Sequence, residues 1–107
     1  MSEQQLLTKI KKDGRRIAKR FKLKYLDIMT EYPQVRSRFG SCDEDKLIRL
    51  RLHNLKTGKF LKYKNLVHTL CHELAHVRFM DHGRDFRKLN QEILQFARES
   101  GIYNPSI

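Results

Sequence analysis

The stretch that most constrains this chain is His72-Glu73-Leu74-Ala75-His76, an H-E-x-x-H motif. On a helix, side chains four residues apart lie one turn apart on the same face, so His72 and His76 can reach one metal ion together. Glu73 lies beside that face, where it can act on a water molecule at the metal without binding the metal itself. Neutral imidazoles and an open ligand position suit zinc. The motif therefore predicts a site for one zinc ion, built on a helix.

The residues around the motif predict the helix that it needs. No Pro or Gly interrupts the chain from Phe60 to Met80. Apolar residues recur there at helical spacing and form one stripe, with both motif histidines on the other side. The residues of this stripe are Tyr63, Leu66, Val67, Leu70, Leu74 and Val77. Such a helix can pack its apolar stripe into a core and present His72 and His76 to a cleft.

A third protein ligand is expected, because catalytic zinc sites usually have three and leave one position open. His82 follows the motif helix, and Gly83 would let the backbone bend sharply at that point. The alternative is Glu92, on the next predicted helix. We favour His82 as the ligand, in which case Glu92 or Asp85 could orient an imidazole from outside the ligand set.

Two further histidines and two cysteines need an interpretation. His53 and His68 are interpreted as ordinary polar or half-buried histidines. Cys42 and Cys71 are expected to be reduced thiols, and Cys42 is interpreted as a small core residue.

The spacing of these residues resembles that of the SprT-like zinc peptidases. The resemblance consists of the H-E-x-x-H motif, five further residues, then His82-Gly83 and Phe86. The stretch 38–42, Arg-Phe-Gly-Ser-Cys, followed by Ile-Arg-Leu at 48–50, resembles their strand region ahead of the catalytic helix. The short chain also resembles the minigluzincins, minimal gluzincin peptidases whose third zinc ligand is histidine. That resemblance implies a zymogen, latent through its C-terminus.

Length and charge limit the alternatives. A chain of 107 residues is expected to form a single domain, 1–107. No apolar run is long enough to span a membrane, and residues 1–10 lack the pattern of a signal peptide, so a cytoplasmic protein without a membrane partner is expected. The formal net charge is +11, which suggests a nucleic acid or another anionic partner.

Patterning along the chain predicts an α+β fold with a small sheet over the motif helix. Ser2 and Gln5 resemble a capping box that opens a helix over 3–20, whose basic surface holds Lys9, Lys12, Arg16, Lys19 and Arg20. Strands are predicted over 22–29, 35–42 and 47–53, the last from its alternating apolar residues. A C-terminal helix is predicted from Arg84 to about residue 100, and an extended tail after Gly101.

The function that these residues predict is a zinc-dependent endopeptidase with Glu73 as the general base. A peptide or protein substrate would pair with the edge of strand 47–53 or of the strand before it. Tyr63, Tyr103 and Arg84 are candidates for stabilising the oxyanion. The apolar residues of the tail suggest a cover for the active site, in a monomer or in a dimer that exchanges tails, and the alternative is a frayed chain end.

Two alternatives remain open. One is a SprT-like peptidase that associates non-specifically with nucleic acid, and the other is a non-catalytic zinc protein that binds nucleic acid. A structural zinc site would need a fourth protein ligand and would have no use for Glu73.

Overall fold

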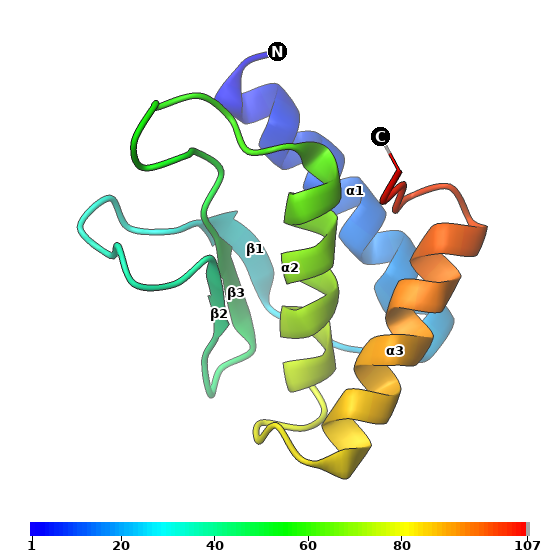
Figure 1. Cartoon of the computed structure of the whole chain (residues 1–107). Coiled ribbons are helices and arrows are strands. Elements are labelled where there is room, and N and C mark those ends of the chain that lie inside the picture. Colours follow the sequence, from blue (N-terminus) through cyan, green and yellow to red (C-terminus); the bar gives the residue numbers. More distant parts are fainter. Residues whose placement is uncertain (107) are drawn as a thin grey trace.

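The computed structural model describes residues 1–106 and contains three helices and three strands in that part of the chain. Figure 1 shows their arrangement, with α2 between the sheet on one side and α3 on the other. In chain order the elements are α1 (Glu3–Phe21), β1 (Asp27–Thr30), β2 (Gly40–Cys42), β3 (Leu47–Leu50), α2 (Tyr63–His76) and α3 (Arg84–Glu99). The predicted α+β class is confirmed.

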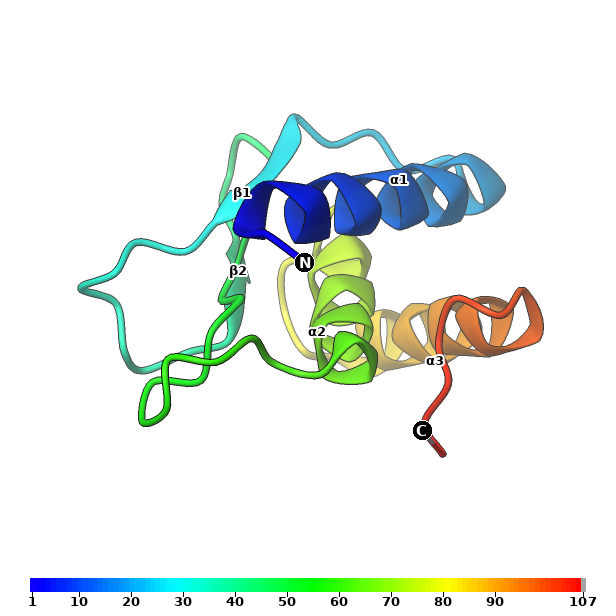
Figure 2. The ribbon, with the colours of Figure 1, turned by 90° about the horizontal axis from the view of Figure 1, so that it is seen from above.

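The sheet has the strand order β1-β3-β2. β3 is central: it pairs in parallel with β1, where Ile48 is opposite Ile28, and antiparallel with β2, where Ile48 is opposite Cys42. Seen from above, the three helices lie together on one side of this sheet (Figure 2). Only β1 and β2 therefore have a free edge.

The core forms where α2 packs between its neighbours. Leu66, Val67, Leu70 and Leu74 of the predicted stripe are at most 1 % exposed, and burying such a side chain contributes about 1.5–3 kcal/mol. They share one apolar cluster with residues of both other helices and of the sheet: Ile10, Ile17, Ile28, Ile48, Leu50 and Ile93. The apolar face of α2 is thus packed into the core, which fixes the position of the helix.

α1 begins as predicted, with a complete capping box. The Gln5 amide donates to Ser2 Oγ over 3.1 Å, and the Ser2 amide donates to Gln5 Oε1 over 2.8 Å. Gly14 costs helix propensity, and close packing explains its presence. A Cβ atom there would lie 2.7 Å from Cδ1 of Ile28 on β1.

All three strands are shorter than predicted. The predicted strand 22–29 is wrong over its first five residues, because Lys22 caps α1 in the left-handed conformation and the Leu23 amide still bonds to Ala18. The predicted strand 35–42 is paired only from Gly40 onward, and a loop precedes it. In the predicted strand 47–53 the ladder ends at Leu50, although Leu52 continues the buried alternation.

The C-terminal tail turns back toward the beginning of α2. Gly101 has a φ of 81°, Ile102 is buried, and the Tyr103 amide donates to Ala97. Lys64 Nζ then donates to the Pro105 carbonyl over 3.2 Å. The predicted extended tail is therefore wrong as to conformation: Ile102 and Tyr103 pack against the protein, and residues 104–106 turn and stay exposed. Its last residue, Ile107, lies outside the described residues. No helix in residues 1–106 has the length and apolarity needed to cross a membrane.

Candidate metal centre

Three ring nitrogens converge at the C-terminal end of α2. Nε2 of His76 lies 3.2 Å from Nε2 of His72 and 3.1 Å from Nε2 of His82, and the remaining pair is 3.3 Å apart. Tetrahedral zinc with Zn–N bonds of about 2.0–2.1 Å would place neighbouring nitrogens about 3.3 Å apart. In the part of the chain that the structure describes, these residues are the one group of three potential ligands of this kind. The donor set therefore fits zinc.

The backbone places each imidazole for a local reason. His72 and His76 are one turn apart on α2, which ends at His76. The chain then reverses through a turn in which Asp81 Oδ1 accepts a hydrogen bond from the Gly83 amide over 2.8 Å. This turn brings His82 back toward His72 and His76. A Cβ atom at position 83 would lie 2.8 Å from that same Asp81 oxygen. The oxygen that it would meet is the end of a flexible side chain, and Gly83 has an extended backbone with a φ of −75°, so the turn does not depend on the sharp bend expected of a glycine here.

A buried aromatic ring and a carbonyl orient the cluster. Phe86, in the first turn of α3, is 3 % exposed and stacks on His76 with ring centroids 4.3 Å apart. It also meets His72 and His82 edge-on, at 4.9 and 5.1 Å. The Phe79 carbonyl lies 2.9 Å from Nδ1 of His76. A proton on Nδ1 donates to that carbonyl, which leaves the lone pair of Nε2 directed at the cluster.

Electrostatics keep the first two imidazoles neutral. Burial lowers the pKa of His72, and the neighbouring His76 and His82 lower it further. Burial also lowers the pKa of His76, although the Phe79 carbonyl opposes this shift. Since only an unprotonated nitrogen can bind a metal, both shifts extend metal binding to lower pH.

Glu73 is a buried carboxylic acid beside this cluster. It is 6 % exposed, and burial raises its pKa to about 7, with the Arg38 cation opposing the shift and the Glu31 anion adding to it. Arg38 is itself held by Glu31, whose Oε1 accepts a hydrogen bond from Arg38 Nε over 2.8 Å. A carboxyl group poised near neutral pH can both accept and return a proton.

A cavity of about 260 Å³ joins Glu73 to the three imidazoles. Its other wall is formed by β2, through Gly40, Ser41 and Cys42, and by Met80 from the turn after α2. A second cavity of about 250 Å³ continues along Phe39, His68 and Thr69. The cluster therefore lies in an open cleft between α2 and the free strand β2.

None of the other predicted candidates lines this cleft. Glu92 and Asp85 are exposed on α3 and do not belong to the ligand group. Tyr63 is at the opposite end of α2, where its hydroxyl donates to Asp13, so it cannot stabilise an oxyanion at the cluster. Tyr103 lies beside His68, with ring centroids 6.2 Å apart. Arg84 is exposed at the start of α3.

The two cysteines differ in their surroundings. Both are free thiols, and burial raises the pKa of Cys42 to about 11 and that of Cys71 to about 12. Cys71 is a fully buried core residue. Cys42, interpreted from the sequence as a small core residue, is only half-buried, since it belongs to the cleft wall. His68 and His53 are polar and partly or fully exposed, as expected.

Sequence reasoning missed two parts of the site. The Phe79 carbonyl leaves no trace in residue type, because every residue carries a carbonyl. Phe86 was noted only for its spacing, and its packing against all three imidazoles was not foreseen. An aromatic residue four positions after His82 was the one available signal.

Comparison with solved structures supports this fold. The chain superimposes on Wss1 from Saccharomyces cerevisiae with a TM-score of 0.79 and 23% identity, over 90% of this chain and 79% of that one. A mutant of the same protein gives a TM-score of 0.80 and 22% identity, over 92% and 82% of the two chains. At this level of identity the likeness concerns the fold.

Comparison with known sequences gives a match to one protein over part of the chain and a match to a family model over most of it. Uncharacterized protein 042R of Invertebrate iridescent virus 3 is 34% identical over 62 residues, which are 56% of this chain and only 39% of that protein. None of these comparisons bears on the minigluzincins. The family model of the WLM domain matches residues 2–102. Because that match takes in nearly the whole sequence, the chain belongs to the WLM domain family.

Proposed function

We propose that this protein is a zinc-dependent endopeptidase, with His72, His76 and His82 as the ligands of one zinc ion. The observation that carries the proposal is the meeting of three Nε2 atoms within 3.1–3.3 Å beside the buried carboxyl group of Glu73. Membership of the WLM family and the fold shared with Wss1 support a peptidase of the zinc-dependent class. When bound, zinc would supply Lewis-acid chemistry, which polarises a carbonyl group and acidifies water.

The chain itself supplies the proton transfer and the orientation of the ligands. Glu73 is the general base: its carboxylate takes the proton of the attacking water and then returns it to the nitrogen of the leaving amine. The Phe79 carbonyl holds His76 in the tautomer with a free Nε2. Phe86 keeps water from one side of the imidazole cluster.

The substrate strand is proposed to pair with β2. Strand 47–53, one of the two edges predicted from the sequence, is excluded because β3 is paired on both sides. β2 keeps a free edge and forms a wall of the cleft that contains Glu73. Main-chain hydrogen bonds to that edge would bind an extended peptide with little demand on its sequence.

The test is Glu73→Gln, which keeps the shape of the side chain and removes its basicity. We expect normal zinc content and a loss of about 100-fold or more in kcat/KM on an unstructured protein substrate. Glu92→Gln, on the exposed face of α3, is the matched control and should retain full activity. Undiminished hydrolysis by Glu73→Gln would refute the assignment of the general base.

Latency through the C-terminal tail remains a separate proposal. In the described residues the tail packs on the start of α2, so inhibition would require it to move or to enter a second copy. Ile102 is a buried core residue, so the deletion that tests latency should begin after Tyr103 and keep Ile102 in place. A latent enzyme would gain activity on this deletion, and equal activity of the two forms would show that the tail does not inhibit.

A second candidate function is association with nucleic acid, supported by the net charge of +11 and by the exposed Lys12, Arg16 and Arg20 on α1. Contacts with several phosphates would make binding weak, independent of sequence and steeply dependent on salt between about 50 and 200 mM. A filter-binding titration with a DNA oligonucleotide measures this, and an absence of binding at low salt would reject it.

A further inference from the structure

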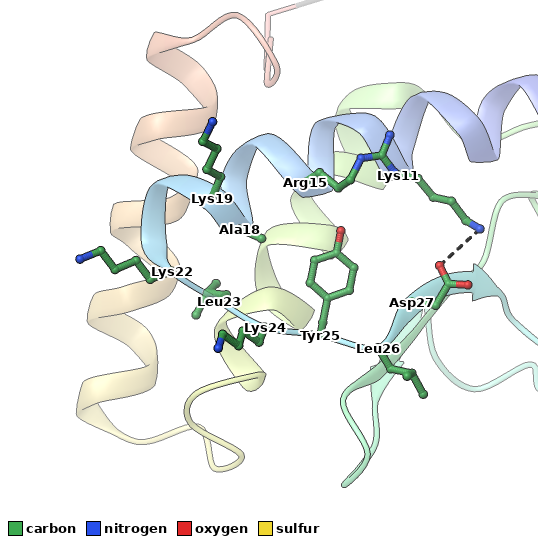
Figure 3. Close-up of a pocket in the computed structure, with 10 residues that line it drawn as sticks. All are labelled: Lys11, Arg15, Ala18, Lys19, Lys22, Leu23, Lys24, Tyr25, Leu26 and Asp27. Atoms are coloured by element: carbon green, nitrogen blue, oxygen red, sulfur yellow. Dashed lines mark ion pairs between the residues drawn. The ribbon is translucent and has the colours of Figure 1, made fainter.

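A groove on another face of the protein lies away from the metal centre. It has a volume of about 610 Å³ and runs between the C-terminal half of α1 and the segment 22–27 that leads to β1 (Figure 3). None of its lining residues also lines the cavity that contains Glu73 and the three imidazoles. The peptidase chemistry proposed above therefore gives this groove no role.

The rim of the groove is cationic on both sides. Three basic residues come from α1 and two from the segment after it: Lys11, Arg15, Lys19, Lys22 and Lys24. Figure 3 shows Lys19, Lys22 and Lys24 gathered around one end and directed outward, and Asp27 at the other. Asp27, the one acidic lining residue, is already paired with Lys11 over 3.3 Å. The unpaired positive charge is thus concentrated at the Lys19 end.

The floor of the groove is apolar. Ala18 and Leu23 form its buried part. Leu26 closes it at the Asp27 end and is 68 % exposed, so its side chain is open to a partner. Covering such a side chain with an apolar partner is favourable, because apolar surface is removed from water.

We infer that this groove is a docking site for an acidic peptide segment with an apolar residue, carried by the protein substrate away from the bond to be cleaved. Carboxylates would meet the rim at Lys19, Lys22 and Lys24, and an apolar side chain would cover Leu26. The inference rests on the proposed peptidase function and adds the class of substrate to it.

The composition of the groove favours a peptide over a polynucleotide. Phosphates need cations but gain nothing from an apolar floor, and bases need an exposed aromatic face on which to stack. The one aromatic lining residue, Tyr25, is only partly exposed, and burial raises the pKa of its hydroxyl. The acidic turn 43–46 also lies close to Leu26, whose amide donates to Lys46 over 2.9 Å. That negative turn disfavours an anionic ligand along the whole groove, so the acidic residues of the peptide would lie at the Lys19 end and its apolar residue at Leu26.

The groove is joined to the metal centre through the end of α2. Arg78 follows the last ligand of the motif by two residues, and its Nη2 donates to the carbonyl of Phe21, the last residue of α1, over 2.7 Å. This contact links the end of α1, which borders the groove, to the segment that follows the motif. A segment bound there would hold a substrate near the cleft without touching the reacting atoms, so docking should act on KM more than on kcat.

The first experiment measures binding alone and does not depend on catalysis. A fluorescent peptide of alternating Glu and Leu is titrated with full-length protein that carries Glu73→Gln. The titration is then repeated with a variant that carries Lys19→Glu and Lys24→Glu in addition. Both lysines are exposed, and the double reversal should weaken binding about tenfold or more. Lys56→Glu with Lys59→Glu, which makes the same change of charge in the exposed loop after β3, should have little effect.

Leu26→Ser tests the apolar floor separately. It should weaken binding of the Glu–Leu peptide and leave binding of a Glu–Ala peptide unchanged. If Lys56→Glu with Lys59→Glu lowers the affinity for the peptide equally, the effect comes from the overall charge of the protein and the inference is overturned. A DNA oligonucleotide that loses more affinity than the peptide on reversal of Lys19 and Lys24 would also overturn it, because the groove would then serve nucleic acid.

The second experiment separates the two proposals. An unstructured substrate with an acidic tail should show a KM raised about tenfold by the Lys19 and Lys24 reversals, whereas a short neutral peptide should be cleaved as before. Loss of cleavage with both substrates would contradict docking. If the protein cleaves neither substrate but binds the Glu–Leu peptide through Lys19 and Lys24, the peptidase proposal fails and the groove stands as an acidic-peptide site.

Discussion

At the first residue of α2 the Tyr63 hydroxyl donates to Asp13, whereas at the other end the Nε2 atoms of His72 and His76 meet only ring nitrogens. Within residues 1–106 the carboxyl group of Glu73 forms no ion pair, although it is 6 % exposed. Burial and the Asp13 partner raise the pKa of Tyr63, which keeps that hydroxyl neutral and fixed.

The difference shows which end of the helix serves stability. A buried polar group that finds its partner inside the chain contributes to folding and needs nothing further. Buried groups that converge on a common point without such partners cost stability, and they persist where a ligand satisfies them. We therefore interpret α2 as a helix that joins a structural end to a proposed functional end through one apolar stripe.

The largest expected effect of a substitution is at the functional end. His76→Ala removes the central ligand of the cluster and should weaken zinc binding about a thousandfold, as measured by competition with a chelator. His68→Ala and Glu92→Ala should leave the zinc affinity unchanged. Retention of zinc by His82→Ala together with its loss in Glu92→Ala would show that the third ligand is misassigned.

A smaller effect, on stability, follows from the buried acid. The pKa of Glu73 is raised from 4.5 to about 7 in the folded protein, so folding favours its protonated form. This contribution is complete below about pH 4.5 and is lost as the pH rises through about 7, a cost near 3 kcal/mol. Metal-free Glu73→Gln should therefore exceed the parent stability by about 3 kcal/mol near pH 8 and equal it near pH 4.

Urea unfolding in the presence of a chelator measures that difference, with Glu92→Gln as the exposed control. A gain in stability of the same size at both pH values would mean that the carboxylate charge is not its cause.

The smallest effect is expected at the structural end. Tyr63→Phe removes the hydrogen bond to Asp13 and should cost about 1 kcal/mol of unfolding free energy, while zinc content and peptidase activity stay unchanged. Reduced activity at unchanged stability would mean that the hydroxyl takes part in the reaction and that the two ends of α2 do not differ as described.

The sequence predicted the meeting of His72, His76 and His82 better than it predicted the sheet. The H-E-x-x-H spacing requires only local helix geometry. The return of His82 is also local, because it depends on a turn in which Asp81 accepts the Gly83 amide. The stripe Leu66, Leu70 and Leu74 likewise predicted the buried face of α2.

Strand ends could not be read locally because pairing with a distant partner decides them. Apolar residues at 22–26 suggested a strand, but Leu23 is buried beneath α1 and the ladder begins only where Asp27 faces Leu47. The order β1-β3-β2 depends on contacts between segments that are far apart in the sequence, and no residue pattern encodes it. The tail was misjudged for the same reason, since Lys64 and Ala97 hold it by bonds to its backbone.

X-ray absorption at the zinc edge of the full-length protein tests the central claim, a catalytic rather than a structural centre at the end of α2. We predict one zinc ion per chain, with three imidazole nitrogens and one oxygen from water at about 2.0–2.1 Å. A sulfur ligand at about 2.3 Å, the distance of a thiolate such as that of Cys42 in the cleft wall, would close the site and contradict the account.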